Sequence, residues 1–564
     1  MSLCIYLNMI LGIIFFSCST LAAPRIPAVV KDNGLVYCTN ANGLSFNPQT
    51  ADAGTSMNVV TEQIYNKLFE LKGNTDKVEP VLAKSYHFSK DGTVITITLR
   101  RGVKFHKTPW FTPTRDLNAE DVVFSLNRML EKNAALPTLD NPEVNSQRLQ
   151  YKIFHEHAKK VSFPYFDSIK LNQKIKKVEV VSPYKVRIIL FKPDASILSH
   201  LASQYAIIFS QEYALQLNAD DNLAQLDLLP VGTGPYQLKN YFRNQYVRLV
   251  RNDHYWGKEP KIKNIVIDLS TDRAGRLIKF LNNECQIAAG PEVSQLGLLN
   301  QNNERYYVKS TEGMNLAYLA FNFNKKIMQK PYIRRAISKA INRERIVNRI
   351  YHHTATVANN IIPTVSWASV VNTVDYAYNY HPNEAKEVLA PLNLTLNLWV
   401  INEERVYNPS PIKMAELIQY DLEKAGVKVN VRYVTRNYLN QNIALGKKDN
   451  YDLILTGWIA GNLDPDSFMR PILGCNTQTE MSNLSHWCNL PFEYAIDQAI
   501  NSTTLRERIK AYNIAQEIAL VEVPIVPIAN VKRILLANSR VKGLKLTPFG
   551  NLHFSELSLK KGRK

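Results

Sequence analysis

The chain has 564 residues, of which 45% are hydrophobic and 21% charged, and this ordinary globular composition excludes a disordered or fibrous protein. At about 100–200 residues per domain, the length predicts about three domains and excludes a small disulfide-stapled scaffold. The 68 Lys and Arg against 49 Asp and Glu give a net charge of +19, which indicates either an anionic partner or a large charged surface that keeps the protein soluble.

The N-terminal 22 residues carry no charged side chain and contain an apolar run over residues 9–16. Thr20 and Ala22 are small residues at positions −3 and −1 of a cut after Ala22. This pattern predicts a secretory signal peptide over residues 1–22, although the usual Lys or Arg near its start is missing. No later segment has about 18 consecutive apolar residues, so no transmembrane helix is predicted in the mature chain.

Removal of this segment leaves four cysteines: Cys38, Cys285, Cys475 and Cys488. An even number in an exported protein predicts two disulfides, with three possible pairings, and four buried thiols are the alternative. Cys475 and Cys488 flank a short polar stretch and could close a small loop. Cys38 and Cys285 would then join distant parts of the chain.

Two patterns in the first third of the chain predict regular elements. The alternating sequence of Val94–Leu99 is typical of a half-buried strand. Asn118, with Asp121 three residues later and an apolar stretch beyond, is typical of a capped helix start.

Later segments predict further helices and strands. Pro331 stands at the start of a stretch with apolar residues at helical spacing, which predicts one helix over residues 331–350. Residues 414–434 predict a helix, a left-handed cap at Gly426 and then a strand. Residues 512–528 repeat this pattern more weakly. There is no internal repeat and no low-complexity linker, so composition marks no domain boundary.

Catalytic motifs are largely missing: the sequence has no HExxH, GxSxG, Walker A or CxxC. The turn Gly232–Pro235 lacks a backbone donor at the proline, which disfavours a phosphate cradle. His155 and His157 have no third metal ligand near them in sequence, and the Asp464-Pro465-Asp466 pattern is typical of a turn. The sequence therefore predicts no enzyme, no metal and no cofactor.

Eight blocks of the chain, in order, resemble the bacterial family 5 extracellular solute-binding proteins, which serve peptide and nickel ABC importers. They are residues 80–128, 230–238, 251–257, 313–324, 334–346, 407–429, 457–468 and 487–496. The resemblance implies an α/β fold: a two-lobed periplasmic binding protein of type II, similar to cluster C, with an additional inserted domain. It also implies disulfides between Cys38 and Cys285 and between Cys475 and Cys488.

The resemblance implies a division of the mature chain. Residues 23–65, 230–312 and 525–564 would form the sheet domain of lobe one, 66–229 its inserted domain, and 313–524 lobe two. The implied function is that of a periplasmic, monomeric receptor that delivers a peptide-like ligand to inner-membrane ABC permease subunits. The run at 470–475 is similar to a subgroup linked to cationic antimicrobial peptides and resistance to them.

In this family, two loops supply much of the contact with peptide backbone. Here they are the loop of Asn42, Gly43 and Leu44, and the loop of Trp458, Ile459, Ala460 and Gly461. Many peptide-binding members carry Asp at the position of Gly461, where it pairs with the ligand's ammonium group. A buried ammonium without a counterion is costly. A Gly461→Asp substitution is therefore expected to favour peptides with a free amine.

Two other side chains are candidates for ligand contact. Asp464 is the nearest carboxylate that could replace the missing one, or it is a structural residue of its turn. Arg405 stands where dipeptide binders place an Arg for the ligand carboxylate, or it is a surface residue. The net charge of +19 keeps anionic ligands open as the alternative: haem with its two propionates, or a nucleic-acid strand along the basic stretches 170–177 and 560–564.

Overall fold

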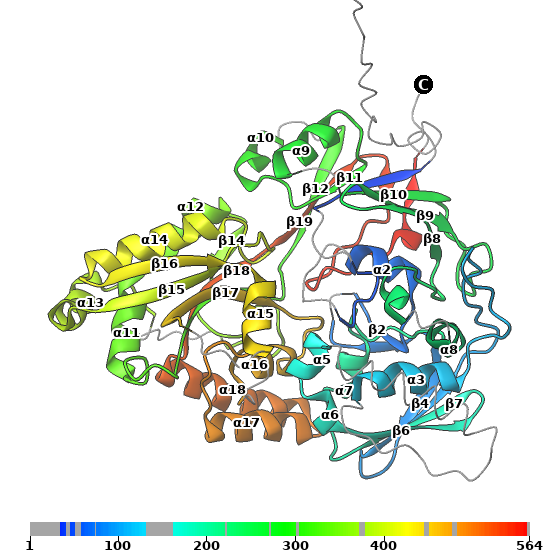
Figure 1. Ribbon diagram of the computed structural model, residues 1–564, viewed down its shortest axis with the longest axis horizontal. Coiled ribbons are helices and arrows are strands. Elements are labelled where there is room, and N and C mark those ends of the chain that lie inside the picture. Colours follow the sequence, from blue (N-terminus) through cyan, green and yellow to red (C-terminus); the bar gives the residue numbers. More distant parts are fainter. Residues whose placement is uncertain are drawn as a thin grey trace, which may run out of the picture.

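The computed structural model describes residues 34–40, 45–50, 58–73, 75–130, 162–219, 223–269, 272–299, 304–370, 378–444, 450–475 and 482–560. The expected signal peptide, residues 42–44, residues 155–157 and the last four residues lie outside this part of the chain. No helix within it is long and apolar enough to cross a membrane. Figure 1 shows two lobes, each built on a sheet with helices packed on it, as the expected two-lobed α/β fold requires.

The first lobe contains a seven-stranded mixed sheet in the order β12-β19-β11-β1-β10-β9-β8. Strand β1 runs parallel to β10 and β11, and the other neighbours are antiparallel. A four-stranded antiparallel sheet, β4-β5-β7-β6, packs in the same lobe. Both sheets contribute to one continuous apolar core, in which Leu35 of the first sheet and Ile95 of the second are fully buried. This shared core makes them one lobe.

The bounds of the first-lobe strands are β1 (Leu35–Cys38), β2 (Phe69–Leu71), β3 (Val78–Pro80), β4 (Ala83–Phe88), β5 (Val94–Leu99), β6 (Ile175–Ser182), β7 (Lys185–Leu190), β8 (Tyr236–Phe242), β9 (Tyr246–Arg251), β10 (Asn264–Asp268), β11 (Ile287–Ala289), β12 (Tyr306–Thr311), β19 (Arg533–Asn538), β20 (Val541–Lys542) and β21 (Ser558–Leu559). Its helices are α2 (Asn58–Ile64), α3 (Ala119–Leu130), α5 (Pro164–Ser168), α6 (Leu171–Lys174), α7 (Ile197–Leu201), α8 (Gln211–Ala219), α9 (Arg273–Leu281) and α10 (Leu296–Leu299).

The second lobe is built on a six-stranded sheet in the order β14-β18-β13-β17-β15-β16. Its central strand β13 is buried along its whole length, because both faces of the sheet are covered. Leu319 belongs to the core on one face, with residues of α11, α12 and α14, whereas Tyr318 belongs to the core on the other face, with residues of α16, α17 and α18.

The bounds of the second-lobe strands are β13 (Asn315–Phe321), β14 (Ala355–Val357), β15 (Thr395–Ile401), β16 (Lys428–Val434), β17 (Leu453–Ile459) and β18 (Ile525–Val531). Its helices are α11 (Pro331–Ala340), α12 (Arg343–Tyr351), α13 (Pro382–Leu389), α14 (Pro411–Lys424), α15 (Arg436–Ala444), α16 (Asp466–Leu473), α17 (Leu490–Asn501) and α18 (Leu505–Glu522).

Two crossing segments connect the sheets. Strand β12 of the first lobe continues through residues 312–314 into β13 of the second, and β18 of the second lobe continues through Lys532 alone into β19 of the first. Lys532 Nζ lies 3.7 Å from a carboxylate oxygen of Glu312, so the two segments are side by side. Figure 1 shows this crossing near the top centre of the molecule.

Most of the predicted elements are confirmed. Residues 94–99 form β5 with alternating burial, and Asn118 accepts a hydrogen bond from the Glu120 backbone while Asp121 accepts one from the Asn118 backbone. Gly426 has a φ of +87° between α14 and β16, as its predicted cap requires.

The prediction of one helix over residues 331–350 was wrong at its centre. The segment forms two helices: α11 ends at Ala340 with Ile341 as its C-cap, and Asn342 caps the start of α12. The Asn342 side chain accepts a hydrogen bond from the Arg345 backbone at 2.8 Å. The helical spacing of apolar residues continues across this break and therefore conceals it.

The pairing of β18 changes one expected domain boundary. The sequence-based division gave residues 525–564 to lobe one, whereas residues 525–531 pair with β13 and β14 of the second lobe. We therefore propose the expected division with this segment moved to lobe two, and residues 66–229 retained as the inserted domain.

Both expected disulfides are confirmed. The Cα atoms of Cys38 and Cys285 are 5.9 Å apart, and those of Cys475 and Cys488 are 4.5 Å apart. The first bond joins residues separated by 247 positions and the second joins residues separated by 13.

Loop length predicts unequal contributions of the two disulfides to stability. We expect replacement of Cys38 and Cys285 by Ser to lower the free energy of unfolding by about 5 kcal/mol, and the same change at Cys475 and Cys488 to lower it by about 3 kcal/mol, because a longer closed loop restricts the unfolded chain more. Denaturant unfolding of the two double variants under oxidising conditions measures the difference. A larger loss for the short loop would contradict this explanation.

Candidate functional site

A cavity of about 140 Å³ lies where the two lobes meet beside the crossing segments. The first lobe contributes Tyr37, Arg273 and Arg533 to its wall, and the second lobe contributes Tyr351 and Arg405. A cavity lined from both sides can hold a ligand that touches both lobes. Its wall is rich in cationic side chains.

Arg405 reaches this cavity, as its candidate role in ligand contact requires. Its side chain is only 9% exposed, and its Nη2 atom donates to Glu403 Oε2 at 2.6 Å. The guanidinium therefore already has a carboxylate partner. A ligand carboxylate at Arg405 would have to share or displace Glu403.

The end of β17 and the residues that follow it pack inward. Trp458 is 8% exposed and its indole Nε1 donates to the Ser467 carbonyl at 2.9 Å, while Ile459 and Ala460 are fully buried. The Ala460 backbone nitrogen donates to the Met314 carbonyl at 3.0 Å. These contacts fix the loop within the second lobe, so any direct ligand contact from it would come from remaining backbone groups.

Gly461 lies against the opposite lobe. A Cβ atom at this position would be 3.2 Å from Ser203 Cβ and 3.2 Å from the Tyr205 ring. The position is buried, and Tyr205 in turn stacks on Tyr165 with ring centroids 4.5 Å apart. The absence of a side chain at Gly461 therefore lets the lobes approach each other closely here.

Asp464 has a structural role, which was one of its two expected roles. It is 2% exposed, Arg508 Nη2 donates to it at 2.7 Å, and the Tyr512 hydroxyl donates to it at 3.2 Å. The carboxylate of Asp464 raises the pKa of Arg508 further, against the effect of burial. Because its oxygens are used inside the second lobe, we no longer propose Asp464 as the partner of a ligand ammonium group.

A buried group of charged side chains joins the two lobes, and sequence reasoning missed it. Asp466 at the start of α16 is fully buried and is contacted by Lys174 Nζ at 2.9 Å, His200 Nε2 at 3.1 Å and Arg470 Nε at 2.8 Å. Lys174 and His200 belong to the first lobe, whereas Asp466 and Arg470 belong to the second. We call these four residues the lobe clasp.

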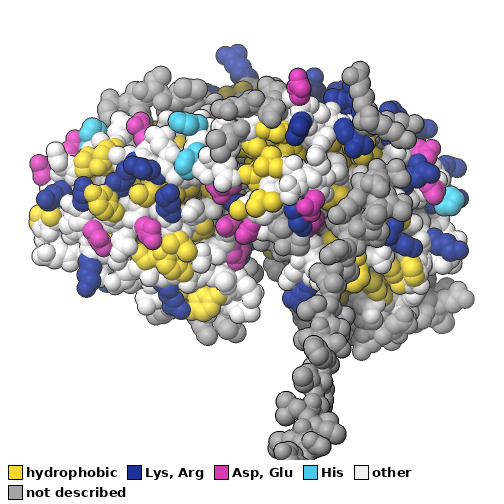
Figure 2. Space-filling view, turned by 90° about the horizontal axis from the view of Figure 1, so that it is seen from above, with side chains coloured by type: hydrophobic (Ala, Val, Ile, Leu, Met, Phe, Trp, Pro, Cys, Tyr) yellow, Lys and Arg dark blue, Asp and Glu magenta, His cyan; other side chains and the backbone are white. Residues whose placement is uncertain are grey.

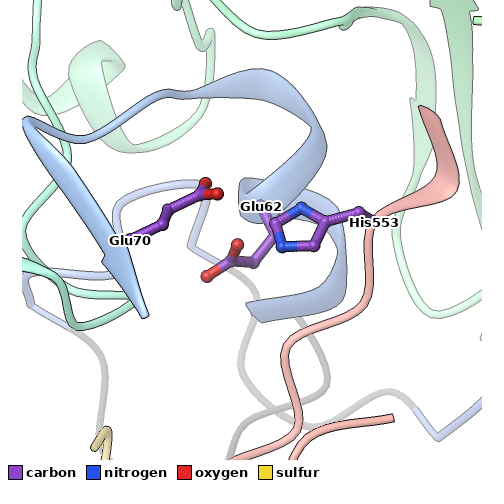
Figure 3. A group of neighbouring side chains, drawn as sticks. All are labelled: Glu62, Glu70 and His553. Carbon is purple, nitrogen blue, oxygen red and sulfur yellow. The ribbon is translucent and has the colours of Figure 1, made fainter. Parts of the chain in front are cut away.

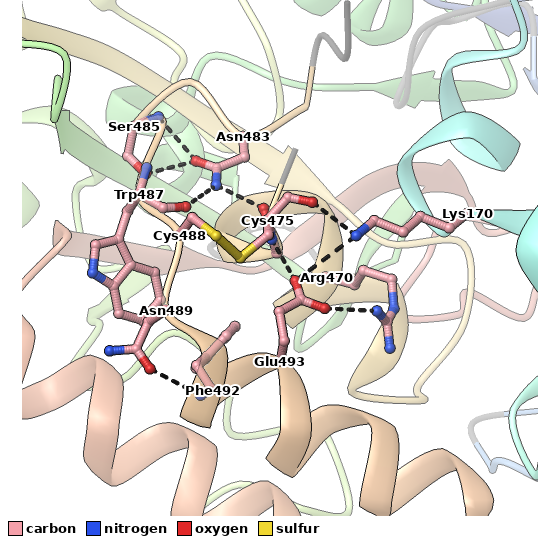
Figure 4. Close-up of a disulfide and its surroundings, with 11 residues drawn as sticks. Lys170, Arg470, Cys475, Asn483, Ser485, Trp487, Cys488, Asn489, Phe492 and Glu493 are labelled. Atoms are coloured by element: carbon pink, nitrogen blue, oxygen red, sulfur yellow. Dashed lines mark hydrogen bonds and ion pairs between the residues drawn. A yellow bond between two sulfur atoms is a disulfide. The ribbon is translucent and has the colours of Figure 1, made fainter. Parts of the chain in front are cut away.

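Neighbouring contacts extend the lobe clasp. The Asn462 side chain of the second lobe donates to the Tyr165 hydroxyl at 3.1 Å, and that hydroxyl lies 3.0 Å from His200 Nδ1. Lys170 Nζ donates to the Cys475 carbonyl at 2.7 Å, so the first lobe also touches the disulfide loop (Figure 4). The lobes thus make direct polar contact below the crossing segments in Figure 1, where α5 and α7 face α16.

The charge of Asp466 is stabilised by its partners. Burial opposes ionisation, but Arg470 and Lys174 outweigh it and hold the pKa of the Asp466 carboxyl well below its usual range. Lys174 also lies 2.7 Å from Asp194 of the first lobe, so its ammonium group contacts one carboxylate from each lobe.

This shift predicts how the clasp depends on pH. The pKa of an Asp carboxyl in the unfolded chain is about 4, and in the folded protein the pKa of Asp466 is lower. The carboxylate therefore stabilises the fold fully above about pH 4, and this stabilisation is lost as the pH falls from there towards the folded pKa. We expect the difference in melting temperature between the wild type and an Asp466→Asn variant to be constant from neutral pH to about pH 5 and to shrink below about pH 4. A difference that stays constant down to pH 2 would contradict the assigned role of the carboxylate.

The basic stretch at 170–177 does not form a continuous exposed cationic surface, because several of its lysines are buried or paired. Lys174 is 7% exposed within the clasp and Lys170 contacts the other lobe, whereas Lys177 pairs with Glu179 at the surface. On the face seen in Figure 2, Lys and Arg side chains are scattered among Asp and Glu over both lobes. The contacts of Lys170, Lys174 and Lys177 weaken the nucleic-acid interpretation of this stretch.

One group in the described part of the chain has the composition of a metal site. The ligand atoms of Glu62, Glu70 and His553 lie within 4.8 Å of one another (Figure 3). The Lys67 ammonium, however, lies 3.3 Å from Glu62 and 3.9 Å from Glu70. A buried lysine therefore already contacts both carboxylates, and the group carries no metal assignment.

Comparisons with known proteins agree with this architecture. Residues 77–480 match the family model of bacterial extracellular solute-binding proteins, family 5 Middle. The chain is 65% identical to the peptide transport periplasmic protein SapA of Haemophilus influenzae over 95% of both chains, and 34% identical to heme-binding protein A of the same species over 92% of this chain and 91% of that one. The crystal structure of a dipeptide-binding protein from Pseudoalteromonas sp. SM9913 in complex with Met-Leu is 34% identical, with a TM-score of 0.83 over 93% of this chain and 100% of that one.

Proposed function

Because the chain belongs to the bacterial extracellular solute-binding proteins of family 5, we propose that it is the periplasmic receptor of a peptide-type ABC importer. In this role it binds a peptide-like ligand between its lobes and presents it to inner-membrane permease subunits. It acts as a monomer without a cofactor and does not transform its ligand. The similarity to a protein named for peptide transport supports the ligand class.

The observation that carries the proposal is the cavity between two lobes that are joined by two crossing segments and also touch through the lobe clasp. A ligand seated there contacts residues of both lobes, so its binding favours the closed arrangement. Extended peptides share one backbone chemistry, and recognition through backbone groups gives affinity with little sequence preference. We propose that residues 42–44 and 458–461 supply such contacts, with Arg405 on the cavity wall.

Ligand binding by the stripped receptor tests the proposal. The oxidised protein is unfolded in guanidinium, dialysed to remove bound molecules and refolded. Calorimetric titration with a mixed-sequence tripeptide library is expected to show saturable binding and a raised melting temperature. Mass spectrometry of the dialysed molecules identifies what was carried from the cell. Absence of peptide binding, together with absence of peptides among the released molecules, would contradict the proposal.

The cationic wall of the cavity favours a second candidate, an anionic ligand such as haem. Arg273, Arg405, Lys532 and Arg533 all line the cavity, and a relative of 34% identity is named as heme-binding. The same stripped protein is titrated with haem in parallel. Saturable haem binding with no response to tripeptides would favour this function over peptide binding.

Salt dependence separates either cavity ligand from adhesion of the charged surface to a polyanion. A strand of nucleic acid bound through many Lys and Arg releases counterions, so its affinity falls steeply as salt rises. We expect tripeptide affinity to change less than about threefold between 50 and 300 mM salt. An oligonucleotide that binds more tightly than tripeptides at 150 mM salt would instead favour the surface role.

A further inference from the structure

The cationic side chains on the cavity wall differ in whether a carboxylate accompanies them. Three of the four have one: Arg273 Nε lies 2.9 Å from Glu404, Arg405 Nη2 lies 2.6 Å from Glu403, and Lys532 Nζ lies 3.7 Å from Glu312. Among the described residues, no carboxylate lies within ion-pair distance of Arg533. Arg533 is therefore the exception.

The structure holds the Arg533 guanidinium in place without neutralising it. Its Nε atom donates to the Pro548 carbonyl at 2.8 Å, whereas its two terminal nitrogens have no hydrogen-bond partner among the described residues. Gly550, with a φ of +90°, leaves the space that the guanidinium fills: a Cβ atom there would be 2.6 Å from Arg533 Cζ. The terminal nitrogens thus remain available beside the cavity that Arg533 lines.

Arg533 is partly buried, and this makes its charge costly. Burial lowers the pKa of Arg533 to about 10, although Tyr205 and Tyr37 oppose the shift. The group still carries its charge at neutral pH. A desolvated cation gains strongly from an anion placed beside it, and a guanidinium can bind both oxygens of a carboxylate in parallel.

The position of Arg533 connects such an anion to both lobes. Arg533 begins β19 directly after the crossing residue Lys532, and it shares the cavity wall with Tyr351 and Arg405 of the second lobe. Tyr205, which raises the pKa of Arg533 against the effect of burial, also lies against Gly461. An anionic group bound at Arg533 would therefore lie where the lobes meet.

We propose that Arg533 anchors a carboxylate of the ligand through its two terminal guanidinium nitrogens. This inference rests on the proposed function, because it assigns a chemical group to the ligand of the same cavity. It differs from the expectation for Arg405, whose guanidinium is already paired with Glu403. The carboxylate could be the C-terminus of a peptide or a propionate of haem.

The test compares ligands with and without the carboxylate. The stripped wild type is titrated with mixed-sequence tripeptides that have either a free or an amidated C-terminus, and with haem or its dimethyl ester. We expect the wild type to prefer the free acid in at least one pair by about 10- to 100-fold, as a charge-assisted bidentate contact predicts. The pair that shows the preference identifies the source of the carboxylate.

Three variants locate the preference. Arg533→Met keeps the apolar stem and is expected to reduce the preference for the free acid to less than about twofold. Arg533→Lys keeps the charge without the planar guanidinium, and its preference is expected to lie between those of the wild type and Arg533→Met. Arg405→Met is expected to retain most of it. Arg506→Met, an exposed position on α18, controls for the change in net charge. Circular dichroism and the melting temperature of each variant confirm folding.

The outcomes distinguish the two proposals. If the wild type binds neither peptides nor haem, the proposed function fails, and this inference fails with it. If the wild type binds ligand but does not prefer the free acid, or if folded Arg533→Met retains the preference, the receptor function stands and the role of Arg533 is wrong. If Arg405→Met loses the preference for the free acid and Arg533→Met keeps it, the ligand carboxylate binds at Arg405 instead.

Discussion

An Asp466→Asn substitution is expected to lower the free energy of unfolding by about 3–5 kcal/mol and to loosen the contact between the lobes. The change keeps the size of the side chain but removes the charge that Lys174, His200 and Arg470 surround. Lys174 keeps its contact with Asp194 and Arg470 keeps its contact with Asp497, but the buried cations lose the carboxylate that they share. Loss of a buried partner costs far more than loss of a surface ion pair. Denaturant unfolding measures the stability, and small-angle scattering of the ligand-free protein measures the separation of the lobes.

Asp497 provides a matched control. Its carboxylate also contacts Arg470, at 2.9 Å, but its side chain is 52% exposed and lies entirely on the second-lobe side of the clasp. We expect Asp497→Asn to cost less than about 1 kcal/mol and to leave the scattering profile unchanged. Equal effects of the two substitutions would show that Asp466 has no special role between the lobes.

A Gly461→Asp substitution is expected to weaken ligand binding by about 10- to 100-fold. The sequence predicted the opposite for peptides with a free amine, because it considered only the missing counterion. In the structure, the first side-chain atom would already lie 3.2 Å from Ser203 and Tyr205 of the other lobe, and the carboxylate would need still more space. Overpacking of this kind costs about 1–3 kcal/mol and acts here against the closed arrangement.

Gly461→Ala separates bulk from charge at this position. The single methyl group requires its neighbours to move by only a few tenths of an ångström, so we expect a change in affinity of less than about fivefold. Both variants are titrated with free-amine and amine-acetylated tripeptides. A selective gain for the free amine in Gly461→Asp would overturn the steric argument and restore the sequence-based expectation.

Local patterns predicted those parts of the fold in which a residue's neighbours in sequence determine its environment. The alternation in residues 94–99 gave β5 its register, and the Asn118–Asp121 pair fixed the start of α3 through contacts within three residues. The break at Asn342 was missed because its cap is compatible with an uninterrupted apolar face. The resemblance supplied the two-lobed arrangement, and it implied the same disulfide pairing that the short stretch between Cys475 and Cys488 had suggested.

The lobe clasp could not be predicted in this way. Asp466 stands in an Asp-Pro-Asp turn and Lys174 in a lysine-rich stretch, and both contexts are typical of exposed residues. The partners His200 and Asp466 are 266 positions apart, so only tertiary structure shows that they meet. Arg533 was missed for the same reason, since its lack of a carboxylate partner depends on segments distant in sequence.

The lobe clasp has a consequence for selectivity. Its ion pairs form between parts of the protein alone, so their contribution to the closed population is the same whichever ligand is bound. Each ligand needs to supply only the remainder of the free energy that shifts the equilibrium between open and closed forms. Such a receptor retains many different ligands with modest contacts to each, and its discrimination between them is limited to the few cavity groups, such as Arg533, that respond to ligand chemistry.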